Sequence, residues 1–223
     1  MAIHTNDKIK SYKDLDGEFI IDASGCPSTI KKELGFYKGI KGITYQQTIE
    51  NCNVFQSNTV KVYYVGKLGY FWIFPRDPKK KEVNLGIGYI SNYNIKLKEK
   101  LEDFKRENKI KGDINYVCGG LIPLGLQRPF MYKNILFVGD ACVGAFIITG
   151  QGIYRALMSG DIAGKCIAKG YPKRYSSIIY KEFLMWDILC KLFYNTDRLM
   201  WKINPDSNLN LVNYFIGLTG MSH

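Results

Sequence analysis

The spacing of apolar and polar residues changes along the chain, and its middle third has the pattern of an antiparallel sheet. Short runs rich in β-branched and aromatic residues are separated by turns that contain glycine or proline. The pattern predicts strands at Ile43–Ile49, Thr59–Val65, Tyr70–Pro75 and Val83–Ile90. A charged segment follows, with Leu97, Leu101 and Phe104 on one face, and predicts an amphipathic helix over Asn94–Asn108.

The regions on either side of this sheet have a different pattern, in which a short apolar strand leads into a loop and a helix. Phe19-Ile20-Ile21 runs into Asp22-Ala23-Ser24-Gly25, and Ser28 is placed to cap a helix over Thr29–Leu34 that Gly35 would end. Later in the chain, the pattern predicts a strand at Ile135–Val138 and helices at Gly152–Lys169 and Ser176–Trp201.

Asp140 is the first candidate for chemistry. A carboxylate just after a buried strand can accept hydrogen bonds from two neighbouring hydroxyls, as on a ribityl or ribose chain. Thr149 is placed to cap the following helix, and the turn Gly150-Gln151-Gly152 would offer amides to a negatively charged ring. Taken alone, Asp140 is more simply a capping or turn aspartate, and the glycines fit an ordinary turn equally well.

The third predicted strand carries a row of aromatic side chains. Alternation along a strand places Tyr70, Trp72 and Phe74 on one face, and Phe71 and Ile73 on the other. Three rings in a row would form one wall of a pocket for a long apolar chain. A sheet core is the simpler explanation when the row is considered alone, because aromatic residues are common in cores.

Together these motifs resemble the geranylgeranyl reductase family of flavoproteins, whose fold is like that of p-hydroxybenzoate hydroxylase. The similarity runs from about Gly17 to Tyr171. The matching segments are Asp22-Ala23-Ser24-Gly25, Tyr70 with Trp72, Phe74 and Pro75, Asn84-Leu85-Gly86-Ile87-Gly88, Val138-Gly139-Asp140-Ala141 and Thr149-Gly150-Gln151-Gly152-Ile153.

The resemblance implies a cofactor, a substrate and a reaction. FAD would be bound by Gly139, Asp140, Gly150, Gln151, Gly152 and Ile153. An isoprenoid chain of an archaeal membrane lipid would be bound by Tyr70, Trp72, Phe74 and Pro75. Reduced FAD would deliver a hydride to one carbon of a C=C bond, and a proton would reach the other. The proton donor stays open among Tyr70, Cys118 and Cys142, and the sequence does not indicate the electron donor.

Two departures from the family pattern affect the cofactor site. Phe146-Ile147-Ile148 occupies the place where the family has a proline before the Thr-Gly turn. The sequence also lacks the Gly-x-Gly-x-x-Gly strand-turn-helix that binds the FAD pyrophosphate, and the acidic residue after the second strand. We therefore expect a truncated member that holds FAD poorly by itself, so its own enzymatic activity stays open.

Composition and charge indicate which partners, metal sites and cellular compartment to expect. The chain has 223 residues, 46% of them hydrophobic, which is ample for a globular core. Its formal charge is +11. The charge fits a general compositional bias best, an anionic membrane surface next and nucleic acid least, so we expect no nucleic-acid partner. Dispersed cysteines and histidines only at positions 4 and 223 predict no metal site and a reducing cytoplasm. The basic charge and the apolar C-terminal helix fit peripheral contact at the inner face of the membrane, although packing of that helix over the sheet is the simpler explanation for its apolar face.

The predicted fold combines α/β and α+β parts. It comprises the C-terminal part of a FAD-binding Rossmann-like domain (residues 1–38 and 118–172), an antiparallel-sheet substrate domain (39–117) and a helical C-terminal region (173–223). Three alternatives to a reductase remain: a cofactor-free module that binds isoprenoids or other lipids, an inactive fragment, and another FAD-dependent oxidoreductase or monooxygenase of the same fold.

Overall fold

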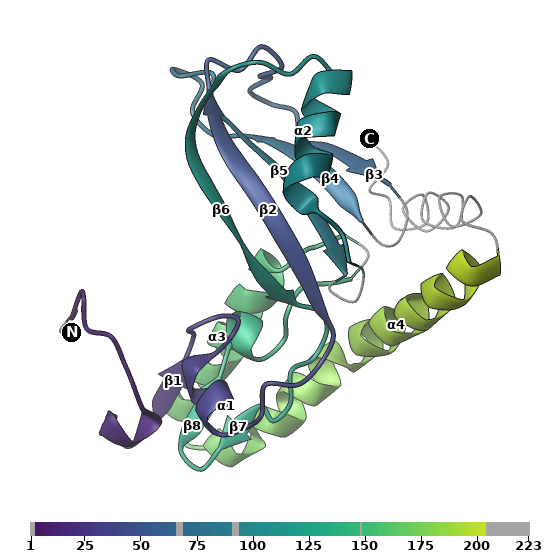
Figure 1. Cartoon of the computed structure of the whole chain (residues 1–223). Helices are drawn as coiled ribbons and strands as arrows, with labels where there is room; N and C mark the ends of the chain where they lie inside the picture. The colour runs from purple at the N-terminus through teal and green to yellow at the C-terminus, as the bar shows by residue number, and fades with distance from the viewer. Residues whose placement is uncertain (1–2, 66–68, 91–93, 148, 204–223) are drawn as a thin grey trace. The chain divides into compact units, whose positions relative to one another are not determined.

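The protein is described from a computed structural model that covers residues 3–65, 69–90, 94–147 and 149–203 (Figure 1). Two compact units divide the chain and are described separately. Unit 1 comprises residues 1–40 and 123–191, and unit 2 comprises residues 41–122 and 192–223. The predicted mixture of helices with parallel and antiparallel strands is confirmed. The last part of the predicted helical C-terminal region, residues 204–223, lies outside the described residues.

Unit 1 contains a small mixed sheet in the order β1-β8-β7. Strand β1 (Ile20–Asp22) is parallel to β8 (Ile135–Phe137), and β7 (Met131–Tyr132) is antiparallel to β8. All three residues of β8 are buried, as expected for a strand with a neighbour on each side. The register places Asp22 opposite Phe137, so the loop that follows Asp22 and the loop that carries Asp140 leave the sheet at the same end.

The helices of unit 1 begin and end close to their predicted positions. Helix α1 (Thr29–Glu33) is capped by the Ser28 side chain, and Gly35 follows it with a φ of 71°. The 3-10 turns η1 (Tyr12–Asp14) and η3 (Pro172–Arg174) precede β1 and the last helix. The long helices are α3 (Ile153–Ala168) and α4 (Tyr175–Ile203), and α4 continues into the residues of unit 2.

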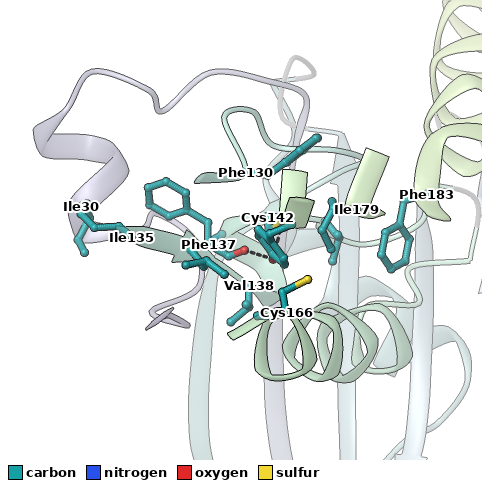
Figure 2. Close-up of a cluster of buried hydrophobic side chains, with 14 residues drawn as sticks. Ile30, Phe130, Ile135, Phe137, Val138, Cys142, Cys166, Ile179 and Phe183 are labelled. Carbon is teal, nitrogen blue, oxygen red and sulfur yellow. Dashed lines mark hydrogen bonds between the residues drawn. The ribbon is translucent and has the colours of Figure 1, made fainter. Parts of the chain in front are cut away.

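The core of unit 1 forms around β8 and the buried faces of α3 and α4. Figure 2 shows Phe137 and Val138 beside Cys142, Cys166 and Ile179. Tyr175, at the start of α4, is fully buried and donates a hydrogen bond from its hydroxyl to the Phe137 carbonyl. This bond ties the long helix to the central strand, because a buried phenol hydroxyl needs a partner.

Unit 2 is a five-stranded sheet in the order β3-β4-β5-β2-β6. Four strands match the prediction closely: β2 (Lys41–Glu50), β3 (Lys61–Tyr64), β4 (Tyr70–Pro75) and β5 (Val83–Ile90). The fifth strand, β6 (Asp113–Pro123), was not predicted. Most β6 residues are exposed at the sheet edge, so the alternation of apolar and polar residues that marks a half-buried strand is absent.

Helix α2 (Leu97–Glu107) covers one face of this sheet (Figure 1). Phe71 and Ile73 of β4 lie in a common core with Leu101 and Phe104 of α2, and the Phe71 and Phe104 rings stack at 4.1 Å. The predicted division of the β4 side chains between two faces is therefore confirmed for the helix-covered face. Among the described residues, no helix combines the length and the apolar character needed to cross a membrane.

Candidate functional site

Asp140 follows β8 in the short 3-10 turn η2 (Gly139–Ala141). Its side chain is half-buried, and its carboxylate has no hydrogen-bond or ion-pair partner among the described residues. Burial raises the pKa of this carboxyl. A carboxylate partly removed from water normally accepts several hydrogen bonds, so an unpartnered one is suited to a ligand that brings its own donors.

The start of α3 lies beside Asp140. Gly152 is the N-cap residue of this helix, and a Cβ added at Gly152 would be 3.8 Å from Asp140 Oδ1. Gly139 is held in place by its backbone amide, which donates to Ser159 Oγ of α3 at 2.8 Å. The structure thus brings Gly139, Asp140 and Gly152 together, as their predicted roles require. Ile153, the first residue of α3, is 81% exposed.

Thr149 does not cap α3, so that prediction is wrong. The turn before the helix is closed by backbone bonds, from the Phe146 amide to the Gln151 carbonyl at 2.9 Å and from the Gly150 amide to the Phe146 carbonyl at 2.8 Å. The helix then begins only after Gly152, three residues beyond Thr149, without a side-chain cap. Thr149 Oγ1 is instead buried and has no hydrogen-bond partner in the described part of the chain. A buried hydroxyl without a partner in the turn that leads to Gly152, which itself lies near Asp140, fits a polar ligand at this loop.

Arg155 stabilises the loop that follows Asp140, a role that sequence reasoning missed. Its side chain is buried, and Nε and Nη2 donate to the carbonyls of Gly144 at 2.9 Å and Val143 at 2.8 Å. The guanidinium also lies 5.0 Å from the centre of the Phe183 ring, and burial lowers its pKa. The only sequence signal was a cation among apolar helix residues, which does not reveal its partners.

Asp22, at the end of β1, is used differently from Asp140. Its carboxylate accepts bonds from the Ser24 amide at 2.9 Å, the Ser24 hydroxyl at 2.6 Å and the Ser28 hydroxyl at 2.6 Å. The Asp22 loop is therefore internally satisfied. Lys31 of α1 is buried nearby, where it donates to the Gln127 carbonyl, and burial lowers the pKa of its ammonium to about 8.

The predicted substrate residues lie on β4 of unit 2. Alternation along the strand puts Tyr70, Trp72 and Phe74 on the face of the sheet opposite to α2, and Pro75 on the face that carries Phe71 and Ile73. Neighbouring ring centres are 6.1 Å apart from Tyr64 to Tyr70, 5.6 Å from Tyr70 to Trp72 and 6.2 Å from Trp72 to Phe74. Trp72 is buried, whereas Phe74 is 38% exposed. Pro75 ends the strand opposite Val83 of β5. The structure therefore provides the continuous aromatic row that the strand pattern predicted.

Trp72 lies flat over a glycine in the neighbouring strand. A Cβ added at Gly86 would be 2.1 Å from Cζ2 of the indole, which a side chain cannot tolerate. The indole Nε1 donates to Asn84 Oδ1 at 2.8 Å, which fixes the orientation of the ring. At Gly88 the nearest atoms would be 3.4 Å or more away, an ordinary contact. Gly86 is therefore required by the Trp72 ring, and Gly88 is not.

The three candidate proton donors lie in different surroundings. Cys142 is fully enclosed in the core of unit 1, and burial raises the pKa of its thiol to about 11. Cys118 is half-buried and accepts a hydrogen bond from Gln46 Nε2 at 2.9 Å. Burial raises the pKa of Tyr70 to about 12, so its hydroxyl keeps its proton near neutral pH. Its enclosure makes Cys142 the least suited to reach a substrate.

Comparison with known proteins bears out the resemblance that the motifs predicted. Digeranylgeranylglycerophospholipid reductase of Methanococcus vannielii is 30% identical over 224 aligned residues, which span 87% of this chain and 53% of that protein. The chain thus spans about half the length of the curated relatives it matches. No protein-family model matches the sequence.

Solved structures show the same fold. A geranylgeranyl bacteriochlorophyll reductase-like protein from Thermoplasma acidophilum superposes with a TM-score of 0.70 at 20% identity, over 88% of this chain and 53% of that one. PqsL of Pseudomonas aeruginosa, a probable FAD-dependent monooxygenase, gives a TM-score of 0.53 at 14% identity, over 80% and 54% of the two chains. The predicted fold class, part of a flavoprotein fold with an antiparallel sheet, is confirmed.

Proposed function

We propose, from the premise that this chain is a relative of the digeranylgeranylglycerophospholipid reductases, that it is part of a flavin-dependent reductase of C=C bonds in the isoprenoid chains of membrane lipids. The observation that carries the proposal is the Asp140 carboxylate, which has no partner in the described segments and lies beside the uncapped start of α3, in a chain 30% identical to such a reductase. When bound, FAD would supply the hydride.

In this proposal the residues around Asp140 bind and orient the cofactor. Asp140 would accept hydrogen bonds from the hydroxyls of the ribityl chain, and the buried Thr149 hydroxyl would find a partner on the ligand. The turn Gly150-Gln151-Gly152 would allow close backbone approach to the ring, and the uncapped start of α3 at Gly152 and Ile153 would offer backbone amides. These residues make up one part of a FAD site, so a further segment must bind the pyrophosphate.

The sheet of unit 2 is the proposed substrate-binding part. Tyr70, Trp72 and Phe74 would contact an apolar chain that runs along β4, because their spacing presents one ring after another in that direction. Pro75 would contact the chain only where the strand ends. Asn84 and Gly86 hold the central ring flat. An extended isoprenoid has the length and the apolar character for such a row. The same row also supports the second candidate, a module that binds isoprenoids without a cofactor.

We further infer that the protein works at the cytoplasmic surface of a membrane. Its substrate would be a membrane lipid, and the formal charge of +11 favours an anionic bilayer surface. All six cysteines are free thiols, which suits a reducing compartment. The contact would be peripheral, through side chains that reach the headgroup region.

The test is a reconstitution from two polypeptides. The chain is purified alone and together with the segment of the Methanococcus vannielii reductase that lies outside the matched region. We expect the chain alone to be nearly colourless, and the mixture to retain FAD with a flavin absorption spectrum. With dithionite as reductant, the mixture should saturate C=C bonds of a digeranylgeranylglycerophospholipid, measured by mass spectrometry as a gain of two mass units per bond.

Asp140→Ala in the same mixture should weaken FAD binding about tenfold or more, because a hydrogen bond to a charged group contributes about 1.5–3 kcal/mol. Asp161→Ala is the matched control, since Asp161 is exposed on α3 and paired only with Lys165. Equal affinities for the two variants would refute the role of Asp140. A mixture that binds isoprenoid lipid but no FAD would favour the cofactor-free module, and one that binds neither would favour an inactive fragment.

A further inference from the structure

A surface hollow in unit 1 lies apart from the residues assigned to the flavin. It has a volume of about 610 Å³ and is formed by the segment before β7 and the first turns of α4. Its lining residues are Arg128, Pro129, Phe130, Ser176, Ser177 and Tyr180. No carboxylate is among them, and nothing in the proposed reductase chemistry uses these side chains.

Arg128 is the one charged group of the hollow, and its charge is not neutralised. Its guanidinium stacks 4.6 Å from the centre of the Tyr180 ring and lies 5.8 Å from that of Phe130. Within the described parts of the chain, Arg128 forms no hydrogen bond and no ion pair. Stacking on a ring uses the face of the guanidinium and leaves its N–H edge free, which is the edge that pairs with phosphate or carboxylate oxygens.

The surroundings of Arg128 favour an anion. The Ser176 hydroxyl also has no partner among the described residues, whereas the Ser177 hydroxyl donates to the Arg174 carbonyl at 2.8 Å. Lys173 and Lys181 flank the segment and are exposed. Cations and a free hydroxyl around a hollow, without an acidic residue in its lining, create a local positive potential.

The walls of the hollow are apolar. Pro129, Phe130 and the Tyr180 ring present carbon atoms beside the free guanidinium edge, and Tyr180 is 38% exposed. A small, fully hydrated anion would leave these walls wet, whereas an anion attached to an apolar body would cover them.

We propose that the hollow formed by Arg128, Ser176 and Tyr180 binds a phosphate group carried on an apolar body, as at the head of a membrane phospholipid. The Arg128 guanidinium pairs with the phosphate oxygens, the Ser176 hydroxyl donates to the same group, and Tyr180 and Phe130 contact the glycerol and first chain carbons. The inference gives the membrane contact a specific site. It does not depend on FAD or on reductase activity.

The test measures binding of the full chain to vesicles of phosphatidylcholine alone and of phosphatidylcholine mixed with phosphatidylglycerol, by co-sedimentation. Arg128→Ala should weaken binding to the anionic vesicles about fivefold, the contribution of one basic residue held at a charged surface. Arg106→Ala is the charge-matched control, because Arg106 is exposed but paired with Asp103 at 2.7 Å. It should change binding less than twofold.

Tyr180 provides a second test that leaves the charge unchanged. Tyr180→Ala removes the stacking partner and should weaken binding to anionic vesicles, whereas Tyr180→Phe keeps the ring and should bind like the unmodified protein. Far-UV circular dichroism checks that each variant is folded. Inorganic phosphate should compete with the vesicles for the unmodified protein but not for Arg128→Ala.

The outcomes separate the possible sources of the anion. Loss of phosphate binding in Arg128→Ala without any change in vesicle binding would support the anion site and assign it to a soluble phosphate compound. Equal effects of Arg128→Ala and Arg106→Ala on both probes would overturn the proposal, because the contribution of Arg128 would then be one of net charge alone. Since no flavin is needed, failure here is distinguishable from failure of the reductase proposal.

Discussion

Replacing Gly86 by alanine should destabilise unit 2, whereas the same change at Gly88 should not. The two glycines are two residues apart in β5 and face the same side of the sheet, so the variants differ only in what the new methyl group meets. At Gly86 the methyl would lie 2.1, 2.3 and 2.8 Å from three indole carbons of Trp72. At Gly88 the closest atom is a Thr44 methyl at 3.4 Å.

The magnitude follows from the displacement of the indole. Trp72 must move by more than 1 Å to restore a contact of about 3.4 Å, and this movement breaks the 2.8 Å bond from its Nε1 to Asn84. Overpacking costs about 1–3 kcal/mol and the lost hydrogen bond about 0.5–1.5 kcal/mol, so we expect a loss of about 2–4 kcal/mol in the free energy of unfolding. Gly88→Ala should be neutral or slightly stabilising, because alanine restricts the unfolded chain.

Urea unfolding followed by far-UV circular dichroism measures both variants, and tryptophan emission reports on the indole. Gly86→Ala should shift the emission to longer wavelength as Trp72 leaves its buried position, whereas Gly88→Ala should leave the spectrum unchanged. Free energies of unfolding that agree within about 0.5 kcal/mol would refute the reasoning, since the expected difference is several times the usual effect of a neutral surface change.

Two further predictions concern unit 1. Arg155→Met keeps the apolar contact with Phe183 but leaves the carbonyls of Val143 and Gly144 without donors. It should therefore lower the free energy of unfolding by about 1–3 kcal/mol and speed amide hydrogen exchange in the loop after Asp140. Unchanged exchange in this loop would contradict the role of Arg155. Burial lowers the pKa of Lys31 from 10.5 to about 8. Between these two pH values the unfolded chain binds more protons than the folded one, so the stability of the unmodified protein should increase as the pH rises from about 8 to 10.5. Lys31→Met should remove that gain in urea unfolding at pH 7 and pH 9, and an identical pH dependence in both proteins would contradict the burial of a charged lysine.

The sequence predicted those parts of the fold that depend on local signals. Alternation of side chains identified four strands of the sheet, and Ser28 and Gly35 marked the ends of α1. β6 was missed because an exposed edge strand has no buried face to create alternation. The Thr149 cap was wrong because two backbone bonds close the turn and delay the helix, and no residue pattern encodes that choice.

The candidate site was predicted in part. The position of Asp140 after a buried strand was visible in the sequence, because short motifs record the order of elements along the chain. The sequence did not show that its carboxylate has no partner among the described residues, because that depends on which donors fold back onto the loop. Asp22 shows the difference, because its similar position gave no hint that Ser24 and Ser28 would satisfy it completely. Arg155 was overlooked for the same reason.

The unsatisfied groups around Asp140 make this loop a sensitive reporter of its ligand. A molecule that binds only the folded chain raises its stability with concentration, by about 2.7 kcal/mol at one hundred times the dissociation constant. A compound that donates hydroxyls to Asp140 and pairs with Thr149 should have the lower dissociation constant, because it relieves two existing desolvation penalties. Riboflavin should therefore raise the melting temperature more than lumiflavin, which has the same ring without the hydroxyl chain. A thermal-shift screen of sugar alcohols, nucleosides and flavins could thus identify the chemical group for which the loop is built, without any assay of catalysis.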